Sequence, residues 1–391
     1  MRRLVLTLLL LVLTGAMMPA KADPITDFWR KQDPELYERY LQMLFRSDDT
    51  SVLVFADSLD EIGRLRHLSN EYSYLAENIR VQHYFTADDS ATFFLHAERA
   101  SELALKCKFI KQYFNAKTSM VAFMINMGHF YRAQRIASEQ IDEANRLGRD
   151  DALYYGFYSL GIIFNQIGEF GRADEAFRNA YKVLERSPSM FSTDAKSQIL
   201  SLIGSNLMHQ EKYSESIRYF RDALRIFPDD DYARSSLAEA YYMTGDIAEF
   251  EECYRQLQSQ TFYDGSIRND YMYRLSVFHM LCNHQYDEAR AIADTMGTDR
   301  LSLPLRQHIY ETIGDVKMAD SLQQLIDART ASDHMSVEMD REATRQAKEL
   351  EAEQLRQQQR AASLRKAGLM ACGVLIVLAL LAFIWRKMKK K

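Results

Sequence analysis

The sequence predicts an all-α protein in which a solenoid of helical hairpins is followed by a long helical stalk and one transmembrane helix. Only 15 glycines and 6 prolines occur among 391 residues, a composition that disfavours sheet-rich and disordered chains. The same order of small and large apolar side chains recurs through the middle of the chain. Near the C-terminus, an uncharged stretch is long enough to cross a bilayer as a helix.

The N-terminus has the pattern of a cleavable export signal. Two arginines open the chain, an apolar stretch follows over residues 4–13, and Ala20-Lys21-Ala22 offers a small-x-small cleavage site. Because the apolar stretch is short for a membrane span, we predict a signal peptide over residues 1–22 rather than an uncleaved anchor.

Residues 23–331 are predicted to form the repeat domain, because a set of small and large side chains returns at matching positions. The three clearest copies are Phe157, Leu160, Gly161, Phe164, Gly168, Phe170, Ala173, Phe177 and Ala180; Leu200, Ile203, Gly204, Leu207, Tyr213, Ser216, Phe220, Ala223 and Pro228; and Leu237, Ala238, Tyr241, Gly245, Phe250 and Tyr254. This pattern resembles the tetratricopeptide repeat, which implies a tetratricopeptide-like α-solenoid.

Each copy is expected to be a helical hairpin whose apolar faces are buried only when hairpins stack. Ala173 and Ala180 let the second helix approach the first, Gly168 permits the turn between them, and Pro228 ends a unit. An insert between Glu185 and Asp194 breaks the repeat period. Upstream, residues 35–110 carry a degenerate pattern, as terminal units do, so we expect about six to eight hairpins.

Residues 332–366 are predicted to form a helical stalk. Glu, Gln, Arg, Lys and Ala dominate there, and Gly and Pro are absent. A thin apolar seam of Met339, Ala343, Ala347 and Leu350 fades into a glutamine-rich stretch. Two interpretations stay open: a weak parallel coiled coil that would make a homodimer, or a single solvated helix.

The C-terminal end predicts the topology. Residues 367–385 carry no charge and would extend about 28 Å as a helix. Trp385 stands at one end of this span, and the tail over residues 386–391 holds five basic residues. The positive-inside bias places this tail in the cytoplasm. We therefore expect a single-pass inner-membrane protein with most of its chain in the periplasm.

Charge and motifs exclude several functions. The formal charge of −5 includes three positive residues in the predicted signal and five in the tail, so residues 23–366 carry −13. Such an acidic exterior repels phosphate backbones, which argues against nucleic-acid binding. No catalytic or phosphate-binding motif occurs, and we expect neither an enzyme nor a cofactor.

The sequence gives only weak support for two sites that would involve cysteines, a metal site and a disulfide bridge. His279, Cys282 and His284 lie close in sequence, but His284 would point away from the other two on a helix, so we expect no metal. Cys253 and Cys282 could form a disulfide bridge between repeats. The favoured interpretation is that they are buried thiols, because three scattered exported cysteines do not form a disulfide framework.

A solenoid of this type offers a concave surface lined by the first helix of each hairpin, where we expect protein or peptide partners to bind. The predicted groove residues are Tyr155, Tyr158, Asn165, Ser201, Ser205, His209, Tyr232, Glu239, Tyr242, Tyr271 and Arg274. The alternative is that several of these tyrosines only pack between units. Some members of the repeat family bind a peptide carboxylate with paired Lys and Asn, but the corresponding lysines are absent here.

The order of signal, repeats, long helix and single span resembles the exported input half of membrane sensors common in Bacteroidetes-type bacteria. In those proteins a histidine kinase or DNA-binding output domain follows the span, whereas this sequence stops six residues after Trp385. The resemblance implies two candidate functions. One is a membrane-anchored periplasmic scaffold, and the other is a sensory input subunit, or a truncated sensor, whose output comes from a separate protein.

Overall fold

The structure is a computed structural model in which every described element is helical. It describes residues 29–388 except 30, 45, 47–49, 88, 260–264 and 299–301, and it describes no side chains at 193, 259, 265–271, 351, 355, 358, 362 and 364–388. The predicted signal peptide lies outside the described residues.

Sixteen α-helices and one short 3-10 helix make up the described part, which contains no strand. They are α3 (Pro34–Leu44), α4 (Ser51–Leu65), α5 (Ser69–Thr86), α6 (Ser90–Lys106), α7 (Ile110–Asn126), α8 (Phe130–Leu147), α9 (Asp150–Gln166), α10 (Phe170–Arg186), η1 (Pro188–Met190), α11 (Thr193–Met208), α12 (Tyr213–Ile226), α13 (Asp231–Thr244), α14 (Ile247–Ser259), α15 (Gly265–Cys282), α16 (Tyr286–Thr295), α17 (Ser302–Thr312) and α18 (Val316–Met388).

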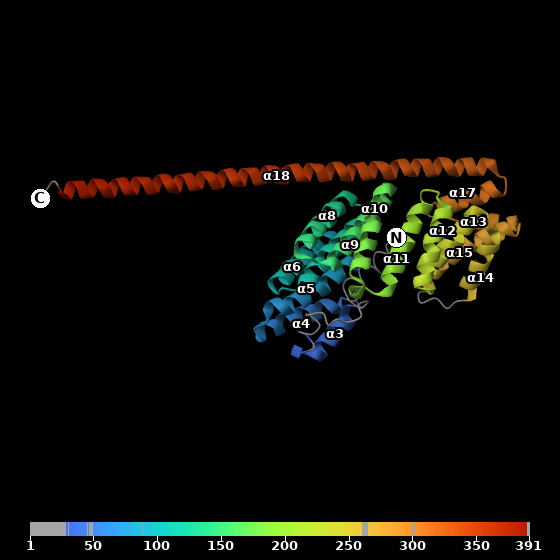
Figure 1. The fold of residues 1–391 in the computed structure, drawn as a ribbon, viewed down its shortest axis with the longest axis horizontal. Coiled ribbons are helices and arrows are strands. Elements are labelled where there is room, and N and C mark those ends of the chain that lie inside the picture. The colour runs from blue at the N-terminus through green and yellow to red at the C-terminus, as the bar shows by residue number, and fades with distance from the viewer. Residues whose placement is uncertain are drawn as a thin grey trace. The chain divides into compact units, whose positions relative to one another are not determined.

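The helices stack as hairpins in chain order (Figure 1). Every consecutive pair from α4 to α17 is in contact. The first helix of a hairpin also contacts the first helix of the next in the pairs α7–α9, α11–α13, α13–α15 and α15–α17. A side-chain hydrogen bond from Gln307 to Gln323 links α17 to the start of α18. Pairing α3 to α18 in order gives eight hairpins, and the expected all-helical repeat solenoid is confirmed.

A small residue on the first helix faces an aromatic ring on the second, in the expected register. Phe220 of α12 is completely buried, and a Cβ atom added to Gly204 of α11 would lie 2.9 Å from its ring. Gly161 of α9 and Phe177 of α10 repeat the arrangement one unit earlier, with an even closer approach. Larger residues on the first helix would therefore push the two helices apart.

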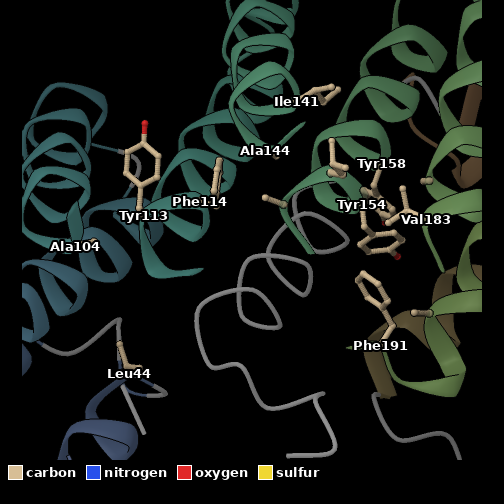
Figure 2. Packing of buried hydrophobic residues seen from close by; sticks show 14 of the residues in the cluster. Leu44, Ala104, Tyr113, Phe114, Ile141, Ala144, Tyr154, Tyr158, Val183 and Phe191 are labelled. Carbon is tan, nitrogen blue, oxygen red and sulfur yellow. The ribbon is translucent and has the colours of Figure 1, made fainter. Parts of the chain in front are cut away.

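The insert between repeats has a defined structure. Phe177 and Phe220 are 43 residues apart, against 34 for Phe220 and Tyr254. The extra residues contain the 3-10 helix η1, and Phe191 follows it. Phe191 is buried, and its ring centroid lies 5.0 Å from that of Tyr154 on α9 (Figure 2). The insert therefore adds to the core instead of looping into solvent.

Nine turns in the described part of the stack each contain one residue in the left-handed conformation. Glycine fills this position in five turns, with φ between 63° and 81°. In four other turns a non-glycine residue adopts φ of 58° to 61°, namely His67, Lys108, Glu211 and His284. Side chains with a Cβ atom are strained there, so these four turns store backbone strain that the glycine turns avoid.

Replacing Glu211 with glycine is expected to stabilise the repeat unit. Relief of the left-handed strain should raise the free energy of unfolding by about 0.5–1 kcal/mol, net of the entropy that glycine adds to the unfolded chain. The matched control is Gly245→Ala in the next turn. Its added Cβ meets nothing within 4 Å, so backbone strain alone should destabilise the protein. Denaturant unfolding measures both, and the same sign for the two changes would contradict the prediction.

The predicted stalk over residues 332–366 lies within one longer helix. This helix, α18, begins at Val316 as the second helix of the last hairpin and continues to Met388. No glycine or proline occurs between Asp315 and Gly368, so nothing in the sequence ends the helix earlier. By its contacts, the chain divides after Val337 into a repeat unit and a second unit.

The predicted membrane span lies outside the residues whose side chains the structure describes. Among the residues whose side chains are described, no helix is both long and apolar enough to cross a membrane. The predicted span over residues 367–385 and the tail over residues 386–391 lie outside those residues.

The described cysteines are free thiols, so the bridge between Cys253 and Cys282 is not formed. Cys253 is buried, and Cys107 and Cys282 are half-buried. Burial raises the pKa of each thiol to about 11, which keeps all three protonated at neutral pH.

Candidate functional site

Polar side chains link the first helices of successive hairpins, and most of the predicted groove residues belong to these links. On α9, Asn165 donates a hydrogen bond from Nδ2 to Oδ1 of Asn206 on α11, at 2.9 Å. Asn206 is itself buried and donates to the carbonyl oxygen of Phe170, at 3.0 Å. We call this set of contacts between first helices the polar ladder.

The second step of the ladder joins α11 to α13. The hydroxyl of Tyr232 is hydrogen-bonded to Ser205, and burial raises the pKa of this tyrosine. Ser201 is completely buried and donates to Asp230 at 3.3 Å. Asp230 also caps α13 by accepting a hydrogen bond from the backbone N–H of Ala233 at 2.9 Å. Ser201 therefore stabilises a helix start and is not open to a ligand.

The third step joins α13 to α15 through an ion pair. Nη2 of Arg274 lies 2.8 Å from Oε1 of Glu239, and its guanidinium carbon lies 5.9 Å from the centroid of Phe278. Burial raises the pKa of Glu239, and the positive charge of Arg274 opposes that rise. The Arg274 side chain keeps 39% of its surface exposed, so part of the guanidinium faces solvent.

The fourth step joins α13 to α17. The hydroxyl of Tyr242 lies 2.8 Å from Nε2 of His308, and its ring stacks on Phe278 at 4.1 Å. Burial lowers the pKa of His308 and raises the pKa of Tyr242 to about 12. Both groups are therefore neutral at pH 7, and the tyrosine and the imidazole can share one hydrogen bond.

Two other predicted groove residues lie on α9. Tyr158 is only 5% exposed and packs near Tyr154, with ring centroids 5.9 Å apart (Figure 2). Tyr155 is half-buried, and burial raises its pKa to about 12, with Asp151 adding to the rise. Tyr158 is therefore a packing residue, whereas the side chain of Tyr155 keeps some access to solvent.

The remaining predicted positions differ in accessibility. His209 is exposed at the end of α11, and its ring stacks on Phe170 at 5.9 Å. Tyr271 lies outside the residues whose side chains the structure describes. A role of any of these residues in binding a partner stays a prediction.

Sequence reasoning missed the acceptors and donors that complete the ladder. Asn206, Asp230 and His308 were not chosen, although each contacts a chosen residue. Asp230 could have been found, since an aspartate at the start of a predicted helix is a typical cap. Asn206 and His308 carry no such local signal, because only the stacking of hairpins brings them to their partners.

A second polar cluster, in the N-terminal hairpins, is compensated internally. Glu77 of α5 is 2% exposed; its carboxylate contacts His96 at 2.5 Å and accepts a hydrogen bond from Arg80 at 3.0 Å. Arg80 also pairs with Asp57 and Asp60 of α4, at 2.7 and 2.8 Å. The cluster therefore links α4, α5 and α6, and the buried carboxylate of Glu77 has hydrogen-bonding and charged partners.

The described residues contain no group of three or more potential metal ligands. His279, one member of the sequence cluster considered above, pairs with Glu251 at 2.8 Å and stacks on Tyr254 at 4.8 Å. Its ring nitrogen Nδ1 is thus engaged with a carboxylate of the preceding hairpin.

One comparison with known proteins, to a family model, agrees with the repeat assignment over part of the chain. The family model of the tetratricopeptide repeat matches residues 207–262, which cover α12, α13 and α14. No curated protein matches the chain in sequence. Two similar solved structures are a Rap protein complexed with competence and sporulation factor and the apo form of RapI. The first has 12% identity over 85% of this chain and 88% of that chain, with a TM-score of 0.44. The second has 11% identity over 77% of this chain and 99% of that chain, with a TM-score of 0.41.

Proposed function

We propose that the chain is a membrane-anchored scaffold that binds protein or peptide partners in the periplasm with the first helices of its repeats. The export signal and the basic tail after the uncharged segment support the location. The helical-repeat fold supports the binding role, because stacked hairpins present an extended surface instead of one closed pocket.

One observation carries the binding part of the proposal. The polar ladder runs from α9 to α17, so side chains from five hairpins follow one another along a single row of first helices. An extended polypeptide laid along this row would meet amide, carboxylate, guanidinium and aromatic groups in sequence. Tyr155, His209 and Arg274 are the groups of the row with solvent access and with side chains suited to such contacts.

A photo-crosslinking residue placed at His209 or Tyr155 is expected to capture the partner in intact cells. The matched control is the same residue at Arg225 of α12, whose side chain is 76% exposed but belongs to a second helix. We expect adducts from the two first-helix positions and few or none from Arg225, resolved by gel mobility and identified by mass spectrometry. Equal adducts from all three positions, or adducts from Arg225 alone, would refute binding by the first helices.

A second candidate function, a sensory input subunit, is favoured by the continuity of α18. This helix leaves the last hairpin and runs without a break to Met388. A continuous helix could transmit a change in the repeats to a separate kinase or transcription regulator. The two functions differ in one measurable respect. A sensory subunit requires a cytoplasmic protein that is recovered together with the tail over residues 386–391, and a scaffold does not.

A further inference from the structure

One face of α18 carries almost no charge over more than forty positions, and Glu353 at its edge is the exception. Its members are Met318, Ser321, Leu325, Ala328, Ser332, Met335, Met339, Ala343, Gln346, Leu350, Gln354, Gln357 and Ala361, which we call the α18 stripe. At 100° per residue these side chains fall within one arc of about 100°. The rest of the helix is rich in Asp, Glu, Lys and Arg, so the nearly uncharged face stands out against its surroundings.

The α18 stripe is exposed throughout. Met335 and Met339 are each 67% exposed, Leu350 is 57% exposed and Leu325 is 48% exposed. The alanine, serine and glutamine members are exposed as well. Large apolar side chains exposed on one face of a long helix indicate a surface made for another helix.

The spacing of the stripe is that of a helix-pairing seam. From Met318 to Met339 its members alternate at three and four residues, which is the seven-residue repeat of a coiled coil. From Met339 to Ala361 the steps are four, three, four, four, three and four, which is two eleven-residue repeats. An eleven-residue repeat keeps a seam on one side of nearly straight helices.

We propose that the α18 stripe pairs two copies of this chain, parallel and in register, along residues 335–361. The orientation rests on the proposed membrane anchoring, because two copies inserted from the same side must run in the same direction. The next position of the spacing is Arg365, and beyond it Gly368, Cys372, Leu375 and Ala379 continue the spacing into the predicted span. Small residues such as Gly368 and Ala379 let membrane helices approach closely.

The composition of the stripe favours a second copy over an unrelated helix. Three of its members are glutamines (Gln346, Gln354 and Gln357), and each would meet its own counterpart only in a parallel, in-register pair. Polar residues at seam positions fix register at a cost in stability. Confinement to one membrane offsets this cost, since it raises the effective concentration of one copy around another.

Crosslinking through introduced cysteines in native membranes tests the pairing. The parent is the full chain with Cys372→Ala, whose other three thiols are buried or half-buried. Met339→Cys, Leu350→Cys and Gln357→Cys place thiols on the stripe, and Lys348→Cys and Arg356→Cys place them outside it. All five positions are exposed, so the substitutions should leave the fold intact. After mild oxidation, we expect a dimer band several times stronger from the stripe positions than from the two control positions.

A pair of introduced charges gives an independent readout. Met339→Glu combined with Leu350→Glu should abolish the crosslink at Gln357→Cys, whereas Lys348→Glu should leave it unchanged. Equal yields from both faces, no dimer at any position, or an adduct whose mass differs from two chains would overturn the proposal. A fast-migrating internal crosslink to Cys107 or Cys282 would instead place the stripe against the chain's own repeats, which also overturns it. Alkaline extraction of the same membranes reports anchoring separately, so a failed anchor is not mistaken for a failed pair.

Discussion

Replacing Phe220 with alanine is expected to lower the free energy of unfolding of the repeat unit by about 3–5 kcal/mol. The Phe220 ring is completely buried, and it fills the space that Gly204 leaves on the facing helix. It belongs to the same buried cluster as Leu237 and Phe250 of the next hairpin. Truncation therefore opens a cavity at a position that two hairpins share, and rigid helices cannot collapse into it.

Denaturant unfolding of the repeat unit, the part of the chain up to Val337, measures this loss. The matched control is Ile226→Ala at the end of the same helix, where the side chain is 37% exposed, and its cost should stay below about 1 kcal/mol. Because each hairpin contacts mainly its neighbours, amide exchange should accelerate first in α11 to α14. A loss below about 1 kcal/mol for Phe220→Ala would show that the helix interface does not depend on this ring.

The parts of the fold that the sequence predicts depend on local or short-range signals. Gly161 and Phe177, or Gly204 and Phe220, lie 16 residues apart, and one turn brings them together. The left-handed turns at Gly168 and Gly245 are also predicted by a local signal, since glycine is the usual residue in that conformation. The register of the helical hairpins was therefore readable without any long-range information.

The parts that the sequence did not predict depend on contacts between hairpins. Tyr158 and Tyr242 look alike in the repeat pattern, yet Tyr158 is 5% exposed and Tyr242 is only half-buried. Which tyrosine is covered depends on the neighbouring first helix, and the insert around η1 changes the spacing of the repeats by nine residues at that point. The hydrogen bond between Tyr242 and His308 spans 66 residues, which no local pattern encodes.

The change in composition that predicts the stalk does not coincide with the start of a helix. The charged, glutamine-rich texture begins near Asp333, but helix formation responds to breakers and caps, and none intervenes after Asp315. The apolar residues Ala319 and Leu322 are buried in the last hairpin, whereas Met335 and Met339 on the same helix are exposed. The same helix is therefore buried against the last hairpin near its start and exposed farther along. The change in composition marks this change in burial and not the end of a helix.

The second large effect is expected where a side chain is added instead of removed. Gly161→Val should destabilise the repeat unit by about 3 kcal/mol, because the new side chain would occupy the position of the Phe177 ring. The matched control is Gly171→Ala on α10, where an added Cβ meets nothing within 4 Å. That change should stabilise the helix by about 0.5–1 kcal/mol, since alanine restricts the unfolded chain.

A double-mutant cycle separates this clash from a general intolerance of α9 to substitution. Phe177→Ala alone should cost about 3–5 kcal/mol, since the ring is only 1% exposed. In the double variant the valine at position 161 enters the space that the ring leaves. The combined cost should therefore fall below the sum of the single costs by about 1–3 kcal/mol. Denaturant unfolding of the four proteins gives the coupling energy directly. Additive costs would mean that Gly161 is required for a reason other than the ring of Phe177, and that the small-to-large pairing does not set the distance between the two helices of a repeat.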